Sequence, residues 1–366
     1  MLKNKHKNII TSMFDKLTVA TMMRNKMKAA LLYGPGDVRV EEVDVPHIND
    51  DQVLIRVRAV GICQSDIRVI KGISKKRYFS YGRDSYGLTG HEWSGEIVDL
   101  GKNTKGISIG DRVVPEIIIS CGKCKMCIEG RSNLCINKEY IIRGYAEYAV
   151  APYNHLYKIP HDIDFEEAAL AEPLAVTLHA NTIANPQPGT TVVIIGAGPM
   201  GLLNLMLSKL SGARVIVSDI IDERLQKAKS LGADDVINPM RENITTRLRE
   251  VNDGFGADIV IVCASSTKAI ENGIKAVGSG GKLLFFAGNI TPAEINIDPN
   301  YIHYNEITIT GSYDHLPRDF TNALKLISLR KVNVKSIISH YTSLIDLPNG
   351  LEIAESRAGL KVMIKP

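Results

Sequence analysis

The sequence has little of what marks membrane proteins, nucleic-acid-binding proteins or disulfide-stabilised scaffolds. No apolar run in the 366 residues approaches the roughly 18 residues that a membrane helix requires. Lys and Arg (44) nearly balance Asp and Glu (40), and aromatic residues make up only 6%, so a broad polyanion-binding surface is not expected. A chain of this length can build two domains with cores of their own, without its six cysteines as disulfide staples. We therefore expect a soluble protein of two globular domains.

The small positive charge is concentrated at the N-terminus. Residues 1–26 carry a net charge of +5, and the remainder carries −1. This segment lacks an uninterrupted apolar stretch and a small-residue cleavage signal, and it is not Arg-rich, so no targeting peptide is expected. We interpret it as a flexible basic leader, with Met22, Met23 and Met27 as alternative starts.

Two rhythms of apolar residues divide the rest of the chain. From about Lys28 to Pro160, short alternating or β-branched runs such as VLIRVRAVGI and SGEIVDLG predict a β-rich domain. From about Pro188, apolar strands alternate with amphipathic helices (TVVIIG, ARVIVSD, ADIVIVC, GGKLLFFAG), which predicts an α/β domain with a parallel sheet covered on both faces. After Tyr313 we expect a helix over 320–329 and short strands that pack back on the first domain.

A glycine motif follows the first strand of the α/β part. VVIIGAGPMGLL gives Gly196, Gly198 and Gly201 the G-x-G-x-x-G spacing between an apolar strand and a helix. These glycines permit a tight turn, a close approach to a pyrophosphate and close helix packing, and the helix N-terminus attracts the phosphates. Asp219 ends the next strand, where its carboxylate can accept hydrogen bonds from the adenosine ribose and would repel a 2′-phosphate. The pattern predicts an NAD-binding domain; the alternative is a glycine turn that binds nothing.

Four cysteines lie within fifteen residues, in CGKCKMCIEGRSNLC. The spacing of Cys121, Cys124, Cys127 and Cys135 allows four thiolates to surround one ion and fill a closed tetrahedral zinc site. A closed site leaves no position for substrate, so this zinc is predicted to be structural. An iron–sulfur cluster is the alternative metal centre. Disulfides are disfavoured because such spacing is typical of reduced cytosolic enzymes, and we expect a cytoplasmic protein.

The order of five motifs resembles one protein family. GICQSD, GHEWSGEIVDLG, the four-cysteine loop, AEPLAVTLHA and GAGPMG follow the order seen in zinc-dependent medium-chain alcohol and polyol dehydrogenases, and the resemblance runs from Met27 to Pro366. The branch it resembles contains sorbitol (L-iditol), galactitol-phosphate and threonine dehydrogenases. The resemblance implies a GroES-like catalytic domain (27–173 and 313–366) with two zinc sites, a Rossmann NAD-binding domain (174–312), and a homo-oligomer that is a tetramer or a dimer.

The same resemblance assigns a second, catalytic zinc site. It implies that Cys63 and His91 bind the metal together with an acid, and either Glu92 or Glu172 fits that place. We leave the choice between the two acids open, since they can exchange. Alternatively, Glu172 is only a residue of a helix N-terminus and Glu92 a solvated turn acid.

Further positions match the proton relay and the coenzyme contacts of the family. Ser65 matches the hydroxyl that starts the relay, and Asp66 matches the acid behind the histidine ligand. The implied coenzyme contacts beyond the glycines are Met200, Asp219 and Arg224 on the adenosine side, and Ala287, Gly288, Asn289, Ser312 and Tyr313 on the nicotinamide side.

Departures from the family bear on the substrate. Threonine dehydrogenases carry His five residues after the catalytic cysteine, where this chain has Arg68, and sorbitol dehydrogenases carry Arg where it has Asp314. The segment 71–90 between the zinc motifs contains three Lys and two Arg but only one Asp. This basic segment is either a solvated loop or a site that captures a phosphorylated or carboxylated polyol.

The predicted function is the transfer of hydride from a secondary alcohol, a polyol or sugar-alcohol derivative, to NAD+. The zinc would lower the pKa of the alcohol and the nicotinamide would accept the hydride. The alternatives are a dehydrogenase of a phosphorylated polyol or sugar acid, and L-threonine 3-dehydrogenase. A non-catalytic zinc- and nucleotide-binding protein is the alternative from another class, but it would have no need of an open metal site. We therefore expect a small-molecule partner, and neither a nucleic acid nor a membrane.

Overall fold

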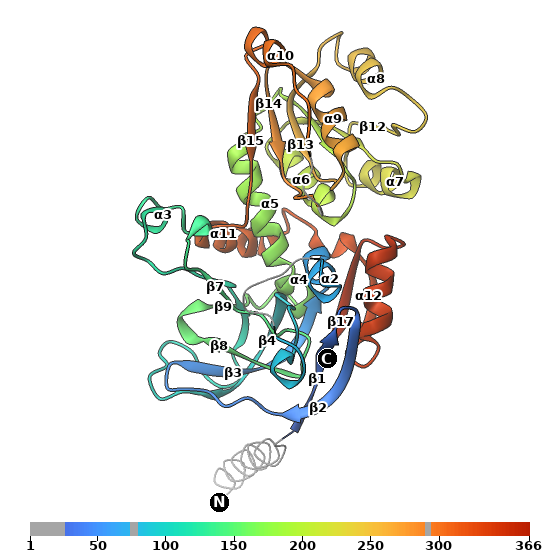
Figure 1. Cartoon of the computed structure of the whole chain (residues 1–366). Coiled ribbons are helices and arrows are strands. Elements are labelled where there is room, and N and C mark those ends of the chain that lie inside the picture. Colours follow the sequence, from blue (N-terminus) through green and yellow to red (C-terminus); the bar gives the residue numbers. More distant parts are fainter. Residues whose placement is uncertain (1–25, 74–79, 290–293) are drawn as a thin grey trace, which may run out of the picture.

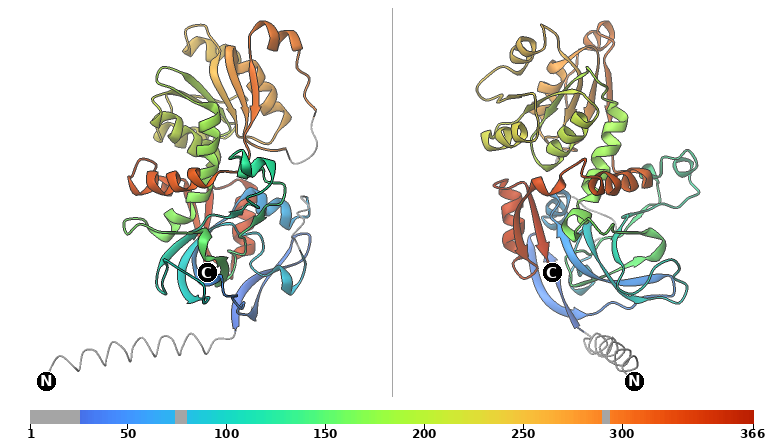
Figure 2. Two further views of the ribbon diagram at one scale, coloured as in Figure 1. Left: turned by 90° about the vertical axis from the view of Figure 1, so that its left-hand side faces the viewer. Right: turned by 180° about the vertical axis from the view of Figure 1, so that it is seen from behind.

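The structure is a computed structural model that describes residues 26–73, 80–289 and 294–366, and these form two domains (Figure 1). The α/β domain lies above the β-rich domain in this view. Helix α5 (Ala171–Ala184) runs between them, and α11 (Pro317–Ser328) lies at the same level, as the turned views in Figure 2 also show. None of the helices in the described ranges is long and apolar enough to cross a membrane.

The α/β domain is a doubly wound sheet of six parallel strands in the order β12-β11-β10-β13-β14-β15. Along the chain its elements are β10 (Thr191–Ile195), α6 (Pro199–Leu210), β11 (Arg214–Ser218), α7 (Asp222–Ser230), β12 (Asp235–Ile237), α8 (Ile244–Val251), β13 (Ala257–Val262), α9 (Thr267–Ala276), β14 (Val277–Phe285), α10 (Pro299–Tyr304) and β15 (Thr308–Gly311). The strand order reverses between β10 and β13, and in such sheets the ligand crevice opens at the carboxyl ends of the strands. The predicted Rossmann fold is confirmed.

Local sequence explains the central elements of this domain. All five residues of β10, TVVII, are buried and mostly β-branched, as a strand covered on both faces requires. Helix α6 begins with Pro199, because the first turn of a helix does not need the N–H that proline lacks. The strand ends and the helix begins within four residues, so the glycine loop has to turn sharply.

The β-rich domain is built on a seven-stranded sheet, in the order β16-β17-β3-β4-β5-β9 with β8 also paired to β3. Two further sheets of two strands each, β1-β2 and β6-β7, belong to the same domain. The strands of the domain are β1 (Lys26–Gly34), β2 (Asp37–Asp44), β3 (Gln52–Gly61), β4 (Glu92–Leu100), β5 (Arg112–Pro115), β6 (Ile118–Ile119), β7 (Glu139–Tyr140), β8 (Tyr148–Pro152), β9 (Leu156–Lys158), β16 (Ile338–Ser343) and β17 (Lys361–Lys365). Its helices are α2 (Gln64–Ile70), α3 (Lys125–Ile128), α4 (Phe165–Ala169) and α12 (Leu347–Ser356), with 3-10 turns at Arg83–Ser85, Ser132–Leu134, Tyr153–His155 and Val334–Ile337. Strand β17 pairs antiparallel with β3, so the last residues return to the first domain.

A shared core holds the two domains together at α5. Most residues of this helix are buried, and small side chains such as Ala171, Ala175 and Ala180 let its neighbours approach closely. The same core cluster includes residues of β10, β13 and α11. Helix α5 therefore crosses the predicted domain boundary at residues 173 and 174. Strand β1 begins at Lys26, and the rest of the predicted leader, 1–25, lies outside the described residues.

Candidate functional site

Cys63, His91 and Glu92 form one of two clusters of metal-ligand side chains in the described residues. One potential ligand atom from each lies within 4.8 Å of the others. Cys63 directly precedes α2, while His91 and Glu92 stand at the start of β4, whose first residue pairs with Gly61 of β3. A Cβ on Gly61 would lie 2.2 Å from Glu92 Oε2, so glycine leaves room for the carboxylate. The register of β3 and β4 thus brings the three side chains together.

Asp66 fixes the ring of His91. Its Oδ1 lies 3.1 Å from His91 Nδ1, and its Oδ2 accepts hydrogen bonds from the Tyr145 hydroxyl (2.7 Å) and the Cys63 amide (3.3 Å). Burial would raise the pKa of Asp66, but the charge and the hydrogen bond of His91 lower it. With Nδ1 turned to this carboxylate, Nε2 is left for a metal. The Ser65 hydroxyl lies in the same group and donates to Cys63 Sγ (3.3 Å).

A lysine that the sequence analysis did not single out contacts Glu92. Lys361, the first residue of β17, places Nζ 2.7 Å from both carboxylate oxygens, and both side chains are buried. Burial would lower the pKa of Lys361, but the charge of Glu92 raises it. A carboxylate has lone pairs to spare, so this contact leaves Glu92 able to bind a metal. A buried lysine at the start of an apolar strand needs a partner of opposite charge. The sequence KVMIK therefore indicates that Lys361 has such a partner, but it does not indicate which residue the partner is.

Glu172, the other acid of the sequence prediction, is not a member of this ligand cluster in the described residues. It is the second residue of α5 and is buried. Burial raises the pKa of Glu172 to about 7, and the charges of His91 and Glu92 also act on it, which places it beside the cluster. Which of the two acids binds a metal directly stays a prediction.

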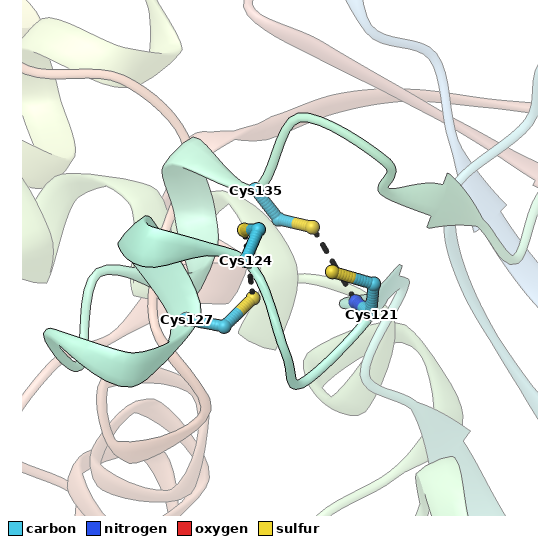
Figure 3. A group of neighbouring side chains, drawn as sticks. All are labelled: Cys121, Cys124, Cys127 and Cys135. Atoms are coloured by element: carbon cyan, nitrogen blue, oxygen red, sulfur yellow. Dashed lines mark hydrogen bonds between the residues drawn. The ribbon is translucent and has the colours of Figure 1, made fainter.

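The four predicted cysteines form the second cluster (Figure 3). All four thiols are free and their sulfur atoms lie within 4.8 Å of one another. Cys124 Sγ and Cys127 Sγ are 3.5 Å apart and share a hydrogen bond, and the backbone N–H of Cys121 donates to Cys135 Sγ (3.3 Å). The backbone N–H of Cys127 lowers the pKa of the Cys124 thiol to about 6, while burial raises the pKa of Cys127 to about 11. Four convergent thiols without a disulfide fit one tetrahedral zinc ion.

The glycine loop lies between β10 and α6. Gly196 has a φ of +104°, which favours glycine, and Gly198 precedes the first residue of α6. A Cβ on Gly201 would lie 1.8 Å from the carbonyl oxygen of Gly196, so only glycine lets the helix pack here. Gly198 leaves the space above the helix N-terminus open except for Arg224 Nη1, which is 3.8 Å from the position of a Cβ. Met200 is half-buried in the first turn of α6.

Asp219 supports this loop directly. It follows β11, and its Oδ2 accepts a hydrogen bond from the Ala197 amide (2.6 Å) while its Oδ1 accepts one from the Ile221 amide (2.9 Å). The carboxylate is thereby held at the end of the strand, where each oxygen keeps further lone pairs for a ribose. Support of the glycine loop is a role that the sequence did not predict.

The residues predicted on the nicotinamide side follow the ends of two strands. Ala287, Gly288 and Asn289 follow β14, and Ser312 and Tyr313 follow β15. Asn289 Oδ1 and Ser312 Oγ are buried without a hydrogen-bond partner in the described part of the chain. Unpartnered polar atoms at the carboxyl ends of parallel strands fit a crevice that receives a polar ligand.

One side chain connects this crevice with the metal cluster. Arg68, on the helix that follows Cys63, donates from Nη2 to Ser265 Oγ (2.9 Å) and from Nη1 to the Gly288 carbonyl (3.2 Å). Ser265 lies beyond the carboxyl end of β13. Arg68 therefore joins the helix beside the ligand cluster of the β-rich domain to the strand ends of the α/β domain.

The structure also contains buried ionic groups that sequence spacing did not reveal. Glu116 lies 3.4 Å from His155 Nδ1 and 3.2 Å from His315 Nε2. Burial would raise the pKa of Glu116, but the close imidazoles of His155 and His315 lower it to about 2. Asp314 lies 3.0 Å from Lys138 Nζ and accepts a hydrogen bond from a tyrosine hydroxyl of β7. The two members of each of these ionic pairs are far apart along the chain, so no local sequence motif predicts the pair.

The predicted basic segment 71–90 is described only in part. Lys71 pairs with Glu355 of α12, and Arg83 begins a 3-10 turn. Lys75, Lys76 and Arg77 lie outside the described residues.

Known proteins match the chain over nearly its whole length. Residues 49–161 match the alcohol dehydrogenase GroES-like domain and residues 199–328 match the zinc-binding dehydrogenase family. The sorbitol dehydrogenase of Halalkalibacterium halodurans is 33% identical over 91% of this chain and 97% of its own length. The chain belongs to the zinc-dependent medium-chain alcohol and polyol dehydrogenases. Among other relatives of this dehydrogenase, the L-threonine 3-dehydrogenase of Pyrococcus horikoshii is 36% identical over 87% of this chain and 92% of its own length.

A solved structure extends the likeness to the coenzyme site. A zinc-binding dehydrogenase of Sinorhizobium meliloti bound to NADP matches with a TM-score of 0.87 and 28% identity, over 94% of this chain and all of its own. The GroES-like and Rossmann domains predicted from the sequence are confirmed. The dehydrogenase family, the two ligand clusters and the glycine loop together identify zinc and a nicotinamide nucleotide as cofactors.

Proposed function

We propose that this dehydrogenase oxidises a secondary alcohol of a polyol or sugar-alcohol derivative to a ketone, with NAD+ as the hydride acceptor. The observation that carries the proposal is the contact that Arg68 makes between the two domains. Arg68 joins the helix behind Cys63 to the strand ends at Ser265 and Gly288, so the metal ligands face the predicted nicotinamide contacts. A binding protein has no need to bring an incomplete metal site and a dinucleotide fold together.

The residues near the proposed catalytic zinc would each have a different role in the reaction. Cys63, His91 and one acid, Glu92 or Glu172, would hold the zinc. A bound zinc lowers the pKa of an alcohol, and the nicotinamide accepts hydride from its carbon. Ser65, already hydrogen-bonded to Cys63, would take the hydroxyl proton and pass it outward, so that alcohol and NAD+ yield ketone, NADH and a proton. Asp66 would keep the imidazole of His91 in place.

The charged groups near the predicted metal ligands favour a neutral, hydroxyl-rich substrate. Glu172 and Asp314 contribute carboxylates, and Lys138 is already paired with Asp314. Lys361 is likewise paired with Glu92. A phosphorylated polyol or sugar acid is the second candidate, because the sequence of segment 71–90 carries three Lys and two Arg against one Asp.

A substrate panel tests this assignment. With the zinc-loaded protein and NAD+, we expect sorbitol-like polyols to give kcat/KM values at least about tenfold above those for galactitol 1-phosphate, threonine and simple secondary alcohols. The measurement is the appearance of NADH absorbance. A clear advantage for galactitol 1-phosphate would favour the phosphorylated substrate, and activity on threonine alone would contradict the polyol assignment.

The choice of NAD over NADP is proposed from Asp219 and tested by replacing it. We expect Asp219→Gly with Ile220→Arg to change the ratio of kcat/KM for NADP over NAD by about 10- to 100-fold, since an arginine–phosphate contact replaces a repulsion. Both coenzymes should also bind more weakly, because Asp219 supports the glycine loop through Ala197.

The single change Ile220→Arg is the matched control for the coenzyme prediction, since it keeps the support of the loop. It should raise NADP affinity only slightly while Asp219 remains. An unchanged ratio in the double variant would refute the role given to Asp219.

The assembly and location of the enzyme are also proposals. Strand β15 is one of the two outer strands of the parallel sheet, and its outer edge, which pairs with no other strand of the described residues, could pair with the same strand of a second copy to form a dimer or, further, a tetramer. The free thiols of both clusters fit a reducing compartment such as the cytoplasm.

A further inference from the structure

Arg68 reaches from one domain to the other. It lies on α2, two residues after Asp66, and its planar guanidinium binds two acceptors of the α/β domain at 2.9 and 3.2 Å. Both acceptors, the Ser265 hydroxyl and the Gly288 carbonyl, are neutral. The contact is therefore set by the geometry of the guanidinium rather than by an ion pair.

The two acceptors belong to neighbouring loops at the ligand-binding edge of the sheet. Ser265 follows β13 and Gly288 follows β14, and these strands are adjacent. Arg68 thus ties both loops to each other and to the helix that begins after Cys63. Gly288 is one of the predicted nicotinamide contacts, whereas Arg68 is not among the residues predicted to take part in the reaction.

Helix α2 is a firm base for this contact. On its far side Gln64 Nε2 donates to the Ala354 carbonyl of α12 (2.6 Å), and Lys71 pairs with Glu355 of the same helix. Beneath it, Asp66 is buried and held by the Tyr145 hydroxyl. A change at Arg68 should therefore act on the two loops rather than on the helix.

A second arginine joins the domains from the adenosine side. Arg224 of α7 lies beside the glycine loop and donates from Nη2 to the carbonyl oxygens of Arg357 (3.0 Å) and Gly359 (3.1 Å), which lie between α12 and β17. The crevice is thus bridged near both of its ends, and only the Arg68 bridge adjoins the metal ligands.

We propose that Arg68 is a positioning residue, which holds the loops after β13 and β14 at a fixed height above the metal ligands before the coenzyme binds. The inference rests on the proposed function, because the height matters for hydride transfer. A misplacement of about 1 Å can cost roughly a hundredfold in rate. Arg68 itself touches no reacting atom in this role.

Three substitutions separate this role from a general effect on folding. Arg68→Met removes both hydrogen bonds at nearly constant length, Arg68→Lys keeps the charge without the two-pronged geometry, and Ser265→Ala removes one acceptor. Arg39→Met, on the remote strand β2, is the matched control, because Arg39 contacts Asp37 of its own strand and the ring of Tyr33 of β1, far from the two loops.

Hydrogen exchange of the coenzyme-free protein is the first measurement. We expect Arg68→Met to speed amide exchange about tenfold in residues 263–266 and 286–289. The exchange rates in Arg68→Lys should be close to those in Arg68→Met, and the rates in Ser265→Ala should lie between those of the wild type and Arg68→Met. Exchange in β3 and β4 should stay as in the wild type. Wild-type exchange in the two loops of Arg68→Met would overturn the proposal, as would a wild-type pattern in Arg68→Lys.

Coenzyme affinity and turnover are the second measurement. By fluorescence titration, NADH should bind Arg68→Met about 10- to 30-fold more weakly, because part of the binding free energy would then be spent on ordering the two loops. Turnover with a saturating alcohol should fall about tenfold, whereas a merely structural role would leave the affinity and kcat of the folded protein unchanged. A wild-type protein that does not bind NADH would contradict the proposed function alone, while the exchange data would still decide the role of Arg68.

Discussion

Replacing Cys63 by Ser or His91 by Ala is expected to lower turnover at least about a thousandfold while leaving NADH binding nearly unchanged. Each variant loses one of the ligands that converge within 4.8 Å. A zinc ion supplies several kcal/mol of stabilisation to a developing negative charge, and about 4 kcal/mol corresponds to a thousandfold in rate. The glycine loop and Asp219 lie in the other domain and depend on neither residue.

The measurement combines kinetics, NADH titration and the zinc content of each purified variant. Both variants should hold one zinc per chain where the wild type holds two, because the four-cysteine site remains. His303→Ala is the matched control, since His303 is an exposed residue of α10. Loss of NADH binding together with turnover would contradict the division of labour between the two domains.

The parts of this protein that sequence predicts well are those whose signals are local. An apolar strand, three glycines and a helix lie within one short stretch of chain, and the structure places Gly196, Gly198 and Gly201 as that pattern requires. The four cysteines are likewise close in sequence, and short spacing alone brings their sulfur atoms together.

The parts that sequence does not predict depend on partners far apart in the chain. Lys361 meets Glu92 because β17 and β4 both pair with β3, a relation that no spacing encodes. Arg68 meets Gly288 because two domains close on each other. Motif and spacing can mark a residue as unusual, but only the packed fold supplies its partner.

The choice between two candidate acids shows the same limit in a single site. The sequence leaves open whether Glu92 or Glu172 is the third ligand. The strand register, which pairs Gly61 with the first residue of β4, brings Glu92 into the ligand cluster. Glu172 arrives separately at the start of α5, with a pKa raised to about 7 by burial. A neutral acid at this place could donate a hydrogen bond as well as accept one.

The second large effect is expected from Cys124→Ser, which removes a ligand of the four-cysteine site. The lobe formed by residues 121–138 has few buried side chains, chiefly Asn133 and Cys135, so it has little core to hold it without a metal. Structural zinc sites contribute folding free energy outright. We expect this variant to keep one zinc per chain and to unfold about 5 °C earlier, as a loss of roughly 3–5 kcal/mol implies for a chain of this length.

The effect should also reach the coenzyme crevice. Asn133 Nδ2 donates to the Tyr313 carbonyl (2.8 Å), and Lys138 bridges the Asn133 carbonyl (2.7 Å) and Asp314 (3.0 Å). These contacts hold the segment after β15, where Ser312 has a buried hydroxyl without a partner among the described residues. Cys124→Ser should therefore weaken NADH binding as well as stability.

Two further variants distinguish the effect of losing the zinc ion from the effect of losing the Asn133 contact. Asn133→Ala should keep both zinc ions yet weaken NADH binding, because it removes the side-chain bonds to Tyr313 and His179 but no cysteine ligand. Cys263→Ala should keep both zinc ions and bind NADH normally, since burial raises the pKa of this thiol to about 12 and it belongs to neither ligand cluster. If Cys124→Ser retained two zinc ions and wild-type stability, the lobe would not be a structural metal site. If Asn133→Ala bound NADH as the wild type does, the lobe would stabilise the fold without helping to shape the crevice.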